Sequence, residues 1–195
     1  MMELQRARRG GVARACALFS ALLLASSQLP AQAQDDATAL ERRVKAAFIF
    51  KFPGYVEWPA GTFARADAPV NIAVVGDDEI AAELAALAAG RTVDGRPLVI
   101  KKASGAQSLA DANVVFVGRA ELARLPQVAK LVQARPVLIV TDAPGALNHA
   151  SMINFVLVQQ RVKFEIAVDE AEKRGLKLSS RLLSVAQSVR KAAAP

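Results

Sequence analysis

Short apolar runs alternate with amphipathic segments through the middle of the chain. A continuous apolar run rich in β-branched residues predicts a buried strand at residues 70–76, and three more strands are predicted at residues 96–103, 113–118 and 136–142. Apolar positions at helical spacing predict helices at residues 79–90 and 125–134, the first with Asp77 or Asp78 as N-cap. Strands and helices that alternate in this way predict βαβ units, and therefore a mainly parallel sheet with helices on both faces.

The pattern changes after residue 150. Two strand-like runs, residues 152–158 and 161–168, are separated only by Gln159-Gln160, which predicts an antiparallel hairpin near the C-terminal end. In the second run the apolar residues 162, 164 and 166 share one face, so that face is expected to meet the core.

Two more helices are predicted after the hairpin. The first starts at Asp169, with Glu172 at capping-box spacing, and ends at Gly175. The second starts near Ser179 and runs through Val189. A single layered α/β domain therefore accounts for residues 34–195, with a mainly parallel sheet and a C-terminal antiparallel hairpin.

An aromatic stretch, VKAAFIFKFPGYVEWP, occupies residues 44–59. Its first part continues a helix, because Leu40, Val44, Phe48 and Phe52 recur at intervals of four and so share one face, which predicts that they are core. Pro53 cannot continue the helical hydrogen bonds, so the helix is expected to end there. Trp58 follows the break, and the pattern leaves open whether it is a core residue or a partner contact.

The N-terminal pattern is that of a secretory signal peptide. Four arginines precede an apolar run at residues 15–25, and the small-x-small triplet Ala31-Gln32-Ala33 follows. The apolar run is shorter than a membrane span requires. We expect residues 1–33 to be removed, leaving a domain of residues 34–195 that is exported to the periplasm.

Composition narrows the chemistry of the exported domain. Cys16 is the one cysteine of the chain and would leave with the signal peptide, which excludes disulfides and thiolate chemistry from residues 34–195. Residues 1–33 carry four arginines and one glutamate, so their removal lowers the formal net charge from +7 to +4. One histidine, His149, with Ser151 two residues away, is a poor basis for a catalytic triad or a metal site. We therefore expect no enzyme, no metal and no cofactor.

A small-molecule crevice remains the alternative function. In a sheet of this type, ligands bind at the carboxyl ends of the strands. The loops at residues 76–78, 118–121 and 142–149 would line such a crevice. Asp77, Asp78 and Glu79 could hold a hard cation there, but N-capping explains them better.

Five segments together resemble the YfiR family of periplasmic proteins. They are VKAAF at residues 44–48 with VEWP at 56–59, GDD at 76–78, GRPL at 95–98, MINF at 152–155 with RVKFEI at 161–166, and GLKLSSRLL at 175–183. The resemblance spans about residues 40–190 in the same order.

The resemblance implies a regulatory function. Members of the family are regulators. The type member binds and represses the periplasmic sensor domain of an inner-membrane diguanylate cyclase, and so controls cyclic-di-GMP, adhesion and biofilm formation. An outer-membrane lipoprotein can sequester the regulator, and family members tend to be dimeric. The partner-binding candidates that follow from it are Glu57 and Trp58, after the helix break, and Phe155 and Glu165, on the hairpin.

The sequence departs from the family pattern at three places. Ala112-Asn113 stands where the family often has Cys-His, so redox sensing through that cysteine cannot operate here. Ala150-Ser151 replaces the usual Gly-Gly before the hairpin, and Ala167 replaces the usual Asn after it. Both changes bear on contacts made by the hairpin.

Overall fold

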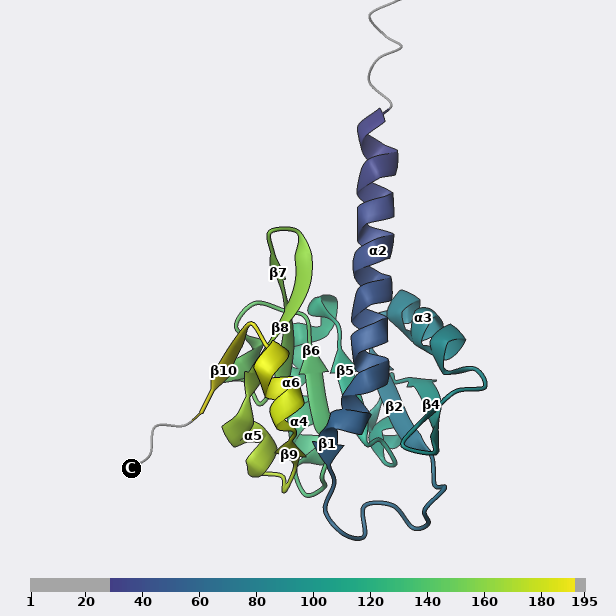
Figure 1. Ribbon diagram of the computed structural model, residues 1–195, viewed down its shortest axis with the longest axis vertical. Coiled ribbons are helices and arrows are strands. Elements are labelled where there is room, and N and C mark those ends of the chain that lie inside the picture. The colour runs from purple at the N-terminus through teal and green to yellow at the C-terminus, as the bar shows by residue number, and fades with distance from the viewer. Residues whose placement is uncertain (1–28, 192–195) are drawn as a thin grey trace, which may run out of the picture. The chain divides into compact units, whose positions relative to one another are not determined.

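The computed structural model describes residues 29–191 (Figure 1). Most of the predicted signal peptide, residues 1–28, lies outside the described residues. The first described element is helix α2 (Leu29–Lys51). Residues 41–191 belong to one compact unit, and the domain described below is that unit.

Helix α2 ends close to the predicted break. A 3₁₀ turn, η1 (Phe52–Tyr55), follows it, with Pro53 in the first turn, where the missing N–H costs nothing. Ile49, Phe50 and Phe52 are buried and Phe48 is partly buried, whereas Leu40 is 61% exposed. The predicted face is therefore correct for its C-terminal half only.

The centre of the domain is an eight-stranded sheet of order β10-β8-β7-β6-β5-β2-β4-β3. All pairs from β4 through β2, β5 and β6 to β7 are parallel, while β7 and β8 form the antiparallel hairpin. The strands are β2 (Val70–Val75), β3 (Thr92–Val93), β4 (Arg96–Lys102), β5 (Val114–Val117), β6 (Leu138–Thr141), β7 (Ile153–Val158), β8 (Arg161–Ala167) and β10 (Ser188–Arg190). The predicted strands and their parallel arrangement are confirmed.

Helices cover both faces of the sheet, as predicted (Figure 1). The first core joins one sheet face to α2 and α3 (Asp78–Ala88), together with α5 (Val168–Glu172) and α6 (Ser180–Val185). The second core joins the other face to α4 (Leu125–Val132) and the 3₁₀ turn η2 (Ala106–Leu109). Two further 3₁₀ turns, η3 (Arg119–Arg124) and η4 (Ala146–Asn148), lie in the loops after β5 and β6. Asp77 caps α3 by accepting a 2.9 Å hydrogen bond from the Ile80 N–H.

The C-terminal helices are shorter than predicted. Helix α5 begins at Val168, one residue before the expected start, and makes no side-chain cap, so the capping-box prediction was wrong. Ser179 does cap α6, but that helix ends at Val185, and Val189 lies in β10, parallel to β8. A separate two-stranded sheet pairs β1 (Val56–Glu57) with β9 (Lys177–Leu178).

One buried ion pair connects α2 to the end of β6. Lys45 Nζ lies 2.9 Å from Asp142 Oδ2 and 2.5 Å from Glu41 Oε1, and both Lys45 and Asp142 are almost fully buried. Asp142 Oδ1 has no hydrogen-bond partner among the described residues, and the Asp142 carbonyl accepts a bond from Arg119. Because an uncompensated buried charge is expensive, the pair constrains where α2 docks.

We expect Lys45→Met to lower the free energy of unfolding by about 3–5 kcal/mol, because the Asp142 carboxylate would remain buried without its cation. Urea unfolding measures this. Lys177→Met is the matched control: it removes an exposed pair with Glu57 and should cost less than about 1 kcal/mol. Equal effects of the two variants would contradict the role given to Lys45.

Candidate partner-binding site

The β7–β8 hairpin extends beyond the rest of the sheet. Strand β6 pairs with β7 only at Ile153 and Asn154, and β10 pairs with β8 only from Glu165 to Ala167. Residues 156–163 therefore pair only with each other among the strands described, and Figure 1 shows them as a two-stranded arm. The two-residue turn predicted at Gln159-Gln160 is confirmed, with φ of 50° and 59° at these residues. Positive φ at both residues is typical of two-residue hairpin turns, whose backbone twist matches the twist of the flanking strands.

Four phenylalanines connect the base of this arm to α2. The ring centroid of Phe155 lies 6.1 Å from that of Phe48 and 5.8 Å from that of Phe52. Phe164 lies 5.3 Å from the same two rings, in edge-to-face contact. These are favourable aromatic geometries, each contributing on the order of 0.5–1.5 kcal/mol beyond burial. We refer to these residues as the aromatic cluster.

The aromatic cluster changes the interpretation of Phe155. Its side chain is only 3% exposed, because Phe48, Phe52 and Phe164 surround it. A partner cannot touch this ring in the structure described, so Phe155 is a core residue here rather than a surface contact. Instead of contacting a partner, Phe155 holds the arm in place.

Trp58 is partly buried and bonded within the chain. Its indole Nε1 donates a 3.2 Å hydrogen bond to the Pro53 carbonyl, and its ring meets the edge of Phe63 at 5.7 Å. The Arg96 guanidinium lies 4.0 Å from the centroid of Phe63. Trp58 therefore contributes to packing, and the part that remains exposed is still open to a partner.

The two glutamates lie in different sheets. Glu57, in β1, forms an ion pair of 3.2 Å with Lys177 of β9, and both side chains are more than two thirds exposed, so the pair stabilises little. Glu165, in β8, is partly exposed and accepts a 3.2 Å hydrogen bond from Ser188 of β10. The structure thus does not join the four predicted contacts into one site.

An apolar surface that the sequence did not single out lies beside the aromatic cluster. Leu157 and Val162 are opposite each other in the hairpin, one alternation beyond the Phe155–Phe164 pair, so they continue the core-facing side of the arm. Leu157 is 50% exposed and Val162 is partly exposed. Phe48 of α2 and Leu183 and Ala186 at α6 are also partly exposed and pack on the same core.

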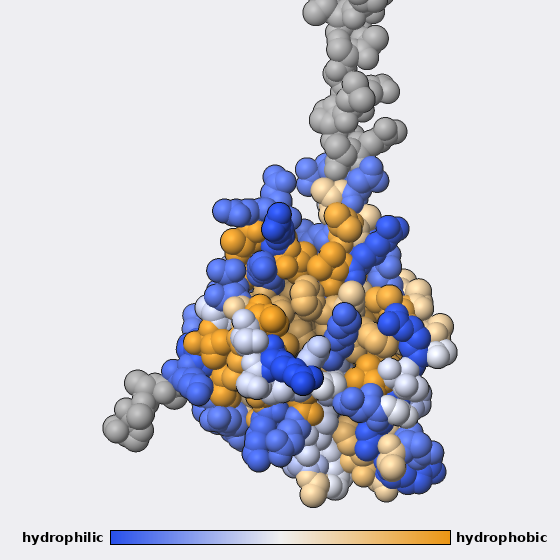
Figure 2. Space-filling model, in the orientation of Figure 1, coloured by the Kyte–Doolittle hydropathy of each residue, from blue (hydrophilic) through white to orange (hydrophobic). Residues whose placement is uncertain are grey.

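We call Phe48, Leu157, Val162, Leu183 and Ala186 the apolar face. Figure 2 shows orange residues gathering over the hairpin, α2 and α6. The period-2 pattern of residues 162, 164 and 166 was visible in the sequence. What it could not show is where the core ends along the arm, because that depends on how far β6 and β10 extend.

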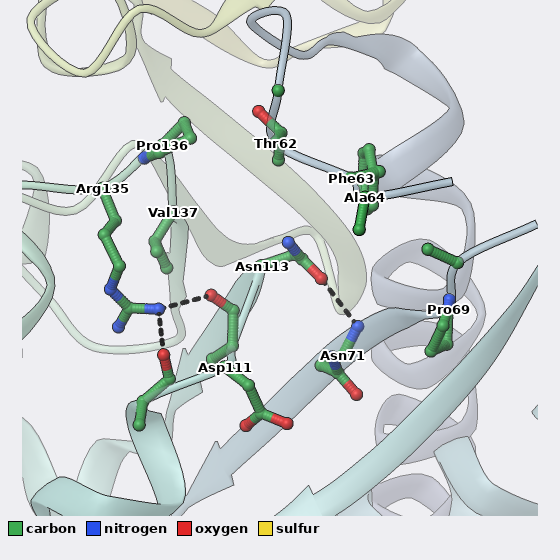
Figure 3. Close-up of a pocket in the computed structure, with 14 residues that line it drawn as sticks. Thr62, Phe63, Ala64, Pro69, Asn71, Asp111, Asn113, Arg135, Pro136 and Val137 are labelled. Carbon is green, nitrogen blue, oxygen red and sulfur yellow. Dashed lines mark hydrogen bonds between the residues drawn. The ribbon is translucent and has the colours of Figure 1, made fainter. Parts of the chain in front are cut away.

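The cavity that Figure 3 shows does not lie at the carboxyl ends of the strands, where the ligand-binding alternative expects a crevice. The strand order places the topological switch between β2 and β5, but a Cβ added to Gly76 there would lie 2.0 Å from Glu121 Cγ, so that position is filled. A cavity of about 440 Å³ instead lies at the amino ends of β2, β5 and β6 (Figure 3). Asn71, Asn113 and Arg135 line it, and the Asn113 side-chain oxygen accepts from the Asn71 N–H at 2.9 Å.

His149 and Ser151 are not brought together as a catalytic pair. Ser151 is fully buried; its hydroxyl lies 2.8 Å from the Thr141 hydroxyl and donates to the Ile153 carbonyl at 3.0 Å. His149 is exposed. Within residues 29–191 no group of three or more His, Cys, Asp or Glu is arranged to hold a metal ion. No helix in that range is long and apolar enough to cross a membrane.

The profile of the YfiR/HmsC-like family matches residues 42–187. The chain belongs to this family. The match covers the sheet, the aromatic cluster and the apolar face, and confirms the resemblance found in the sequence. No curated protein is significantly similar to the chain in sequence.

A solved structure confirms the α/β fold. A conserved domain protein from Vibrio cholerae O1 biovar El Tor superposes with a TM-score of 0.52 at 13% identity, over 76% of this chain and 60% of that protein. The chain thus spans less than two thirds of the length of the Vibrio protein. The ABC domain in complex with L-Trp from Streptococcus pneumonia gives a TM-score of 0.47 at 12% identity, over 62% of this chain and 55% of that one.

We expect Phe155→Ala to lower the free energy of unfolding by about 3–5 kcal/mol, because it opens a cavity inside the aromatic cluster. Thermal and urea unfolding measure this loss. Trp58→Ala should cost less, since Trp58 is only partly buried. A stable Phe155→Ala protein with weakened partner binding would instead make Phe155 a contact.

Proposed function

We propose that the protein is a periplasmic regulator that binds and represses the sensor domain of an inner-membrane diguanylate cyclase. The YfiR/HmsC-like family consists of regulators rather than enzymes, and membership supports this function. The observation that carries the proposal is the apolar face, where core-facing positions of the hairpin continue past the core to the partly exposed Leu157 and Val162. An apolar surface bounded by polar residues is typical of a protein-binding site.

The partner's chemistry follows from the two sides of the arm. One side presents Leu157 and Val162, and the other presents the exposed cations Arg161 and Lys163. A partner that encloses the arm therefore needs an apolar pocket for the first side and acidic residues near the second. Trp58, Glu57 and Glu165 remain proposed contacts at the margins, and Phe155 supports the arm from within.

The rest of the proposal follows the family. We propose that the chain acts without catalysis or a cofactor, that it dimerises, and that an outer-membrane lipoprotein can sequester it. Residues 34–195 carry no cysteine, so the signal that releases the partner is not a disulfide within these residues. The 440 Å³ cavity supports the second candidate, a small-ligand sensor, with its site at the amino edge of the sheet.

Deletion of the gene should raise cyclic-di-GMP, and re-expression should restore the original level, because a repressor of the cyclase has been removed and returned. Mass spectrometry of cell extracts measures the nucleotide. An unchanged level after deletion would count against the function. The re-expressed protein, recovered from the periplasm, should also begin near Gln34 if residues 1–33 are a cleaved signal peptide.

Leu157→Asp should weaken binding to the sensor domain about 10-fold or more while the fold is retained, because it places a charge in the apolar face. Leu131→Asp is the matched control: Leu131 is 45% exposed and lies on α4, which covers the other face of the sheet. Calorimetry with the purified sensor domain measures both variants. Equal losses would show that the apolar face is not the binding surface.

A further inference from the structure

Arg174 carries a buried donor without an acceptor. The residue follows α5 and is partly buried, and its Nη1 has no hydrogen-bond partner among the described residues. Burial lowers the pKa of Arg174 from its ordinary value, and the charge of Glu170 opposes this only in part. A guanidinium N–H left unpaired in this way costs free energy, and such groups are often explained by a ligand or ion.

The neighbouring carboxylates do not bond Arg174, and Asp169 Oδ1 is itself buried without a hydrogen-bond partner among the described residues. Glu170 Oε1 lies 2.7 Å from Lys173 Nζ, and Asp169 Oδ2 lies 4.0 Å from the same atom. Neither forms a salt bridge with Arg174 within the described part of the chain. Arg174 is therefore not held by a local ion pair.

Two cavities meet at Arg174. One, of about 490 Å³, is lined by Arg174 together with Lys130, Gln133 and His149, and its remaining walls are apolar. The other, of about 360 Å³, is lined by Arg174, Lys173, Arg135 and Gln133, with the loop at residues 59–62 opposite. The residues lining these two cavities include several cations and donors but no carboxylate.

This chemistry favours an oxyanion over a neutral ligand. Arginine offers a planar fork of donors that matches phosphate and carboxylate, and a second cation nearby compensates the remaining charge. Lys130 lies on α4 and is exposed, so its flexible ammonium can reach an anion seated at Arg174. The carbonyl groups at the C-terminal end of α4 carry partial negative charge and would repel an anion. They do not accept the free Arg174 Nη1 donor in the described structure, so this donor stays available to a ligand.

We propose that Arg174, with Lys130, Gln133 and His149, forms a binding site for an oxyanion such as a phosphate group. The group belongs either to a free small molecule or to a lipid headgroup. The site is separate from the apolar face and does not depend on the proposed regulatory function.

Calorimetric titration of the exported protein with inorganic phosphate and pyrophosphate tests the site. Arg174→Gln should weaken binding about 10- to 100-fold, as expected for the loss of charge-assisted hydrogen bonds. Lys51→Gln is the control, since it removes the same charge from an exposed residue that lines neither cavity. Co-sedimentation with phosphatidylglycerol vesicles, against phosphatidylcholine vesicles, distinguishes a headgroup from a free anion.

A second measurement separates ligand binding from a structural role. If Arg174 serves a ligand, the Arg174→Gln protein without phosphate should unfold at the same temperature as Lys51→Gln, or higher, because an unpaired buried donor has been removed. A marked drop in unfolding temperature for Arg174→Gln alone would overturn the proposal. So would the absence of binding to both anions and both vesicles, or equal losses in the two variants.

Discussion

The position of the hairpin arm depends on the aromatic cluster. A two-stranded hairpin is at best marginally stable by itself, and residues 156–163 have no other strand beside them among those described. The rings of Phe155 and Phe164 face Phe48 and Phe52, so α2 supplies the packing that a third strand would otherwise give. The surface formed by Leu157 and Val162 exists in one defined place only because this contact holds the arm beside it.

Aromatic contacts alone do not define how a helix docks, because dispersion and hydrophobic burial are only weakly directional. Lys45 is one turn from Phe48, and its ammonium reaches Asp142 at the end of β6. Sliding or rotating α2 would separate this pair inside the protein and leave the buried Asp142 carboxylate uncompensated, while Lys45 would keep Glu41 of its own helix. The aromatic cluster therefore supplies most of the attraction, while the ion pair selects the register in which Phe48 meets the hairpin.

The centre of the sheet was predictable because its parallel strands β2, β5 and β6 are buried on both faces and so read as continuous apolar runs, as at residues 70–75 and 114–117. The elements that sequence patterns missed are β1, β3, β9 and β10, of two or three residues each. Such strands are too short for a period to be seen. Val189 fits the spacing of a helix with Leu182 and Val185, but pairing with β8 placed it in a strand instead.

The candidate site was less predictable, since it depends on where burial ends. Phe155 and Leu157 lie on the same face of the same strand and are both hydrophobic. Phe155 is nevertheless 3% exposed, whereas Leu157 is 50% exposed. Phe48 and Phe52 pack on Phe155, whereas Leu157 lies beyond the residues that pair with β6 and β10. No local pattern encodes where that pairing ends. The same holds for Arg174. Glu170 pairs with Lys173 and not with the adjacent Arg174, and only the folded geometry decides between the two cations.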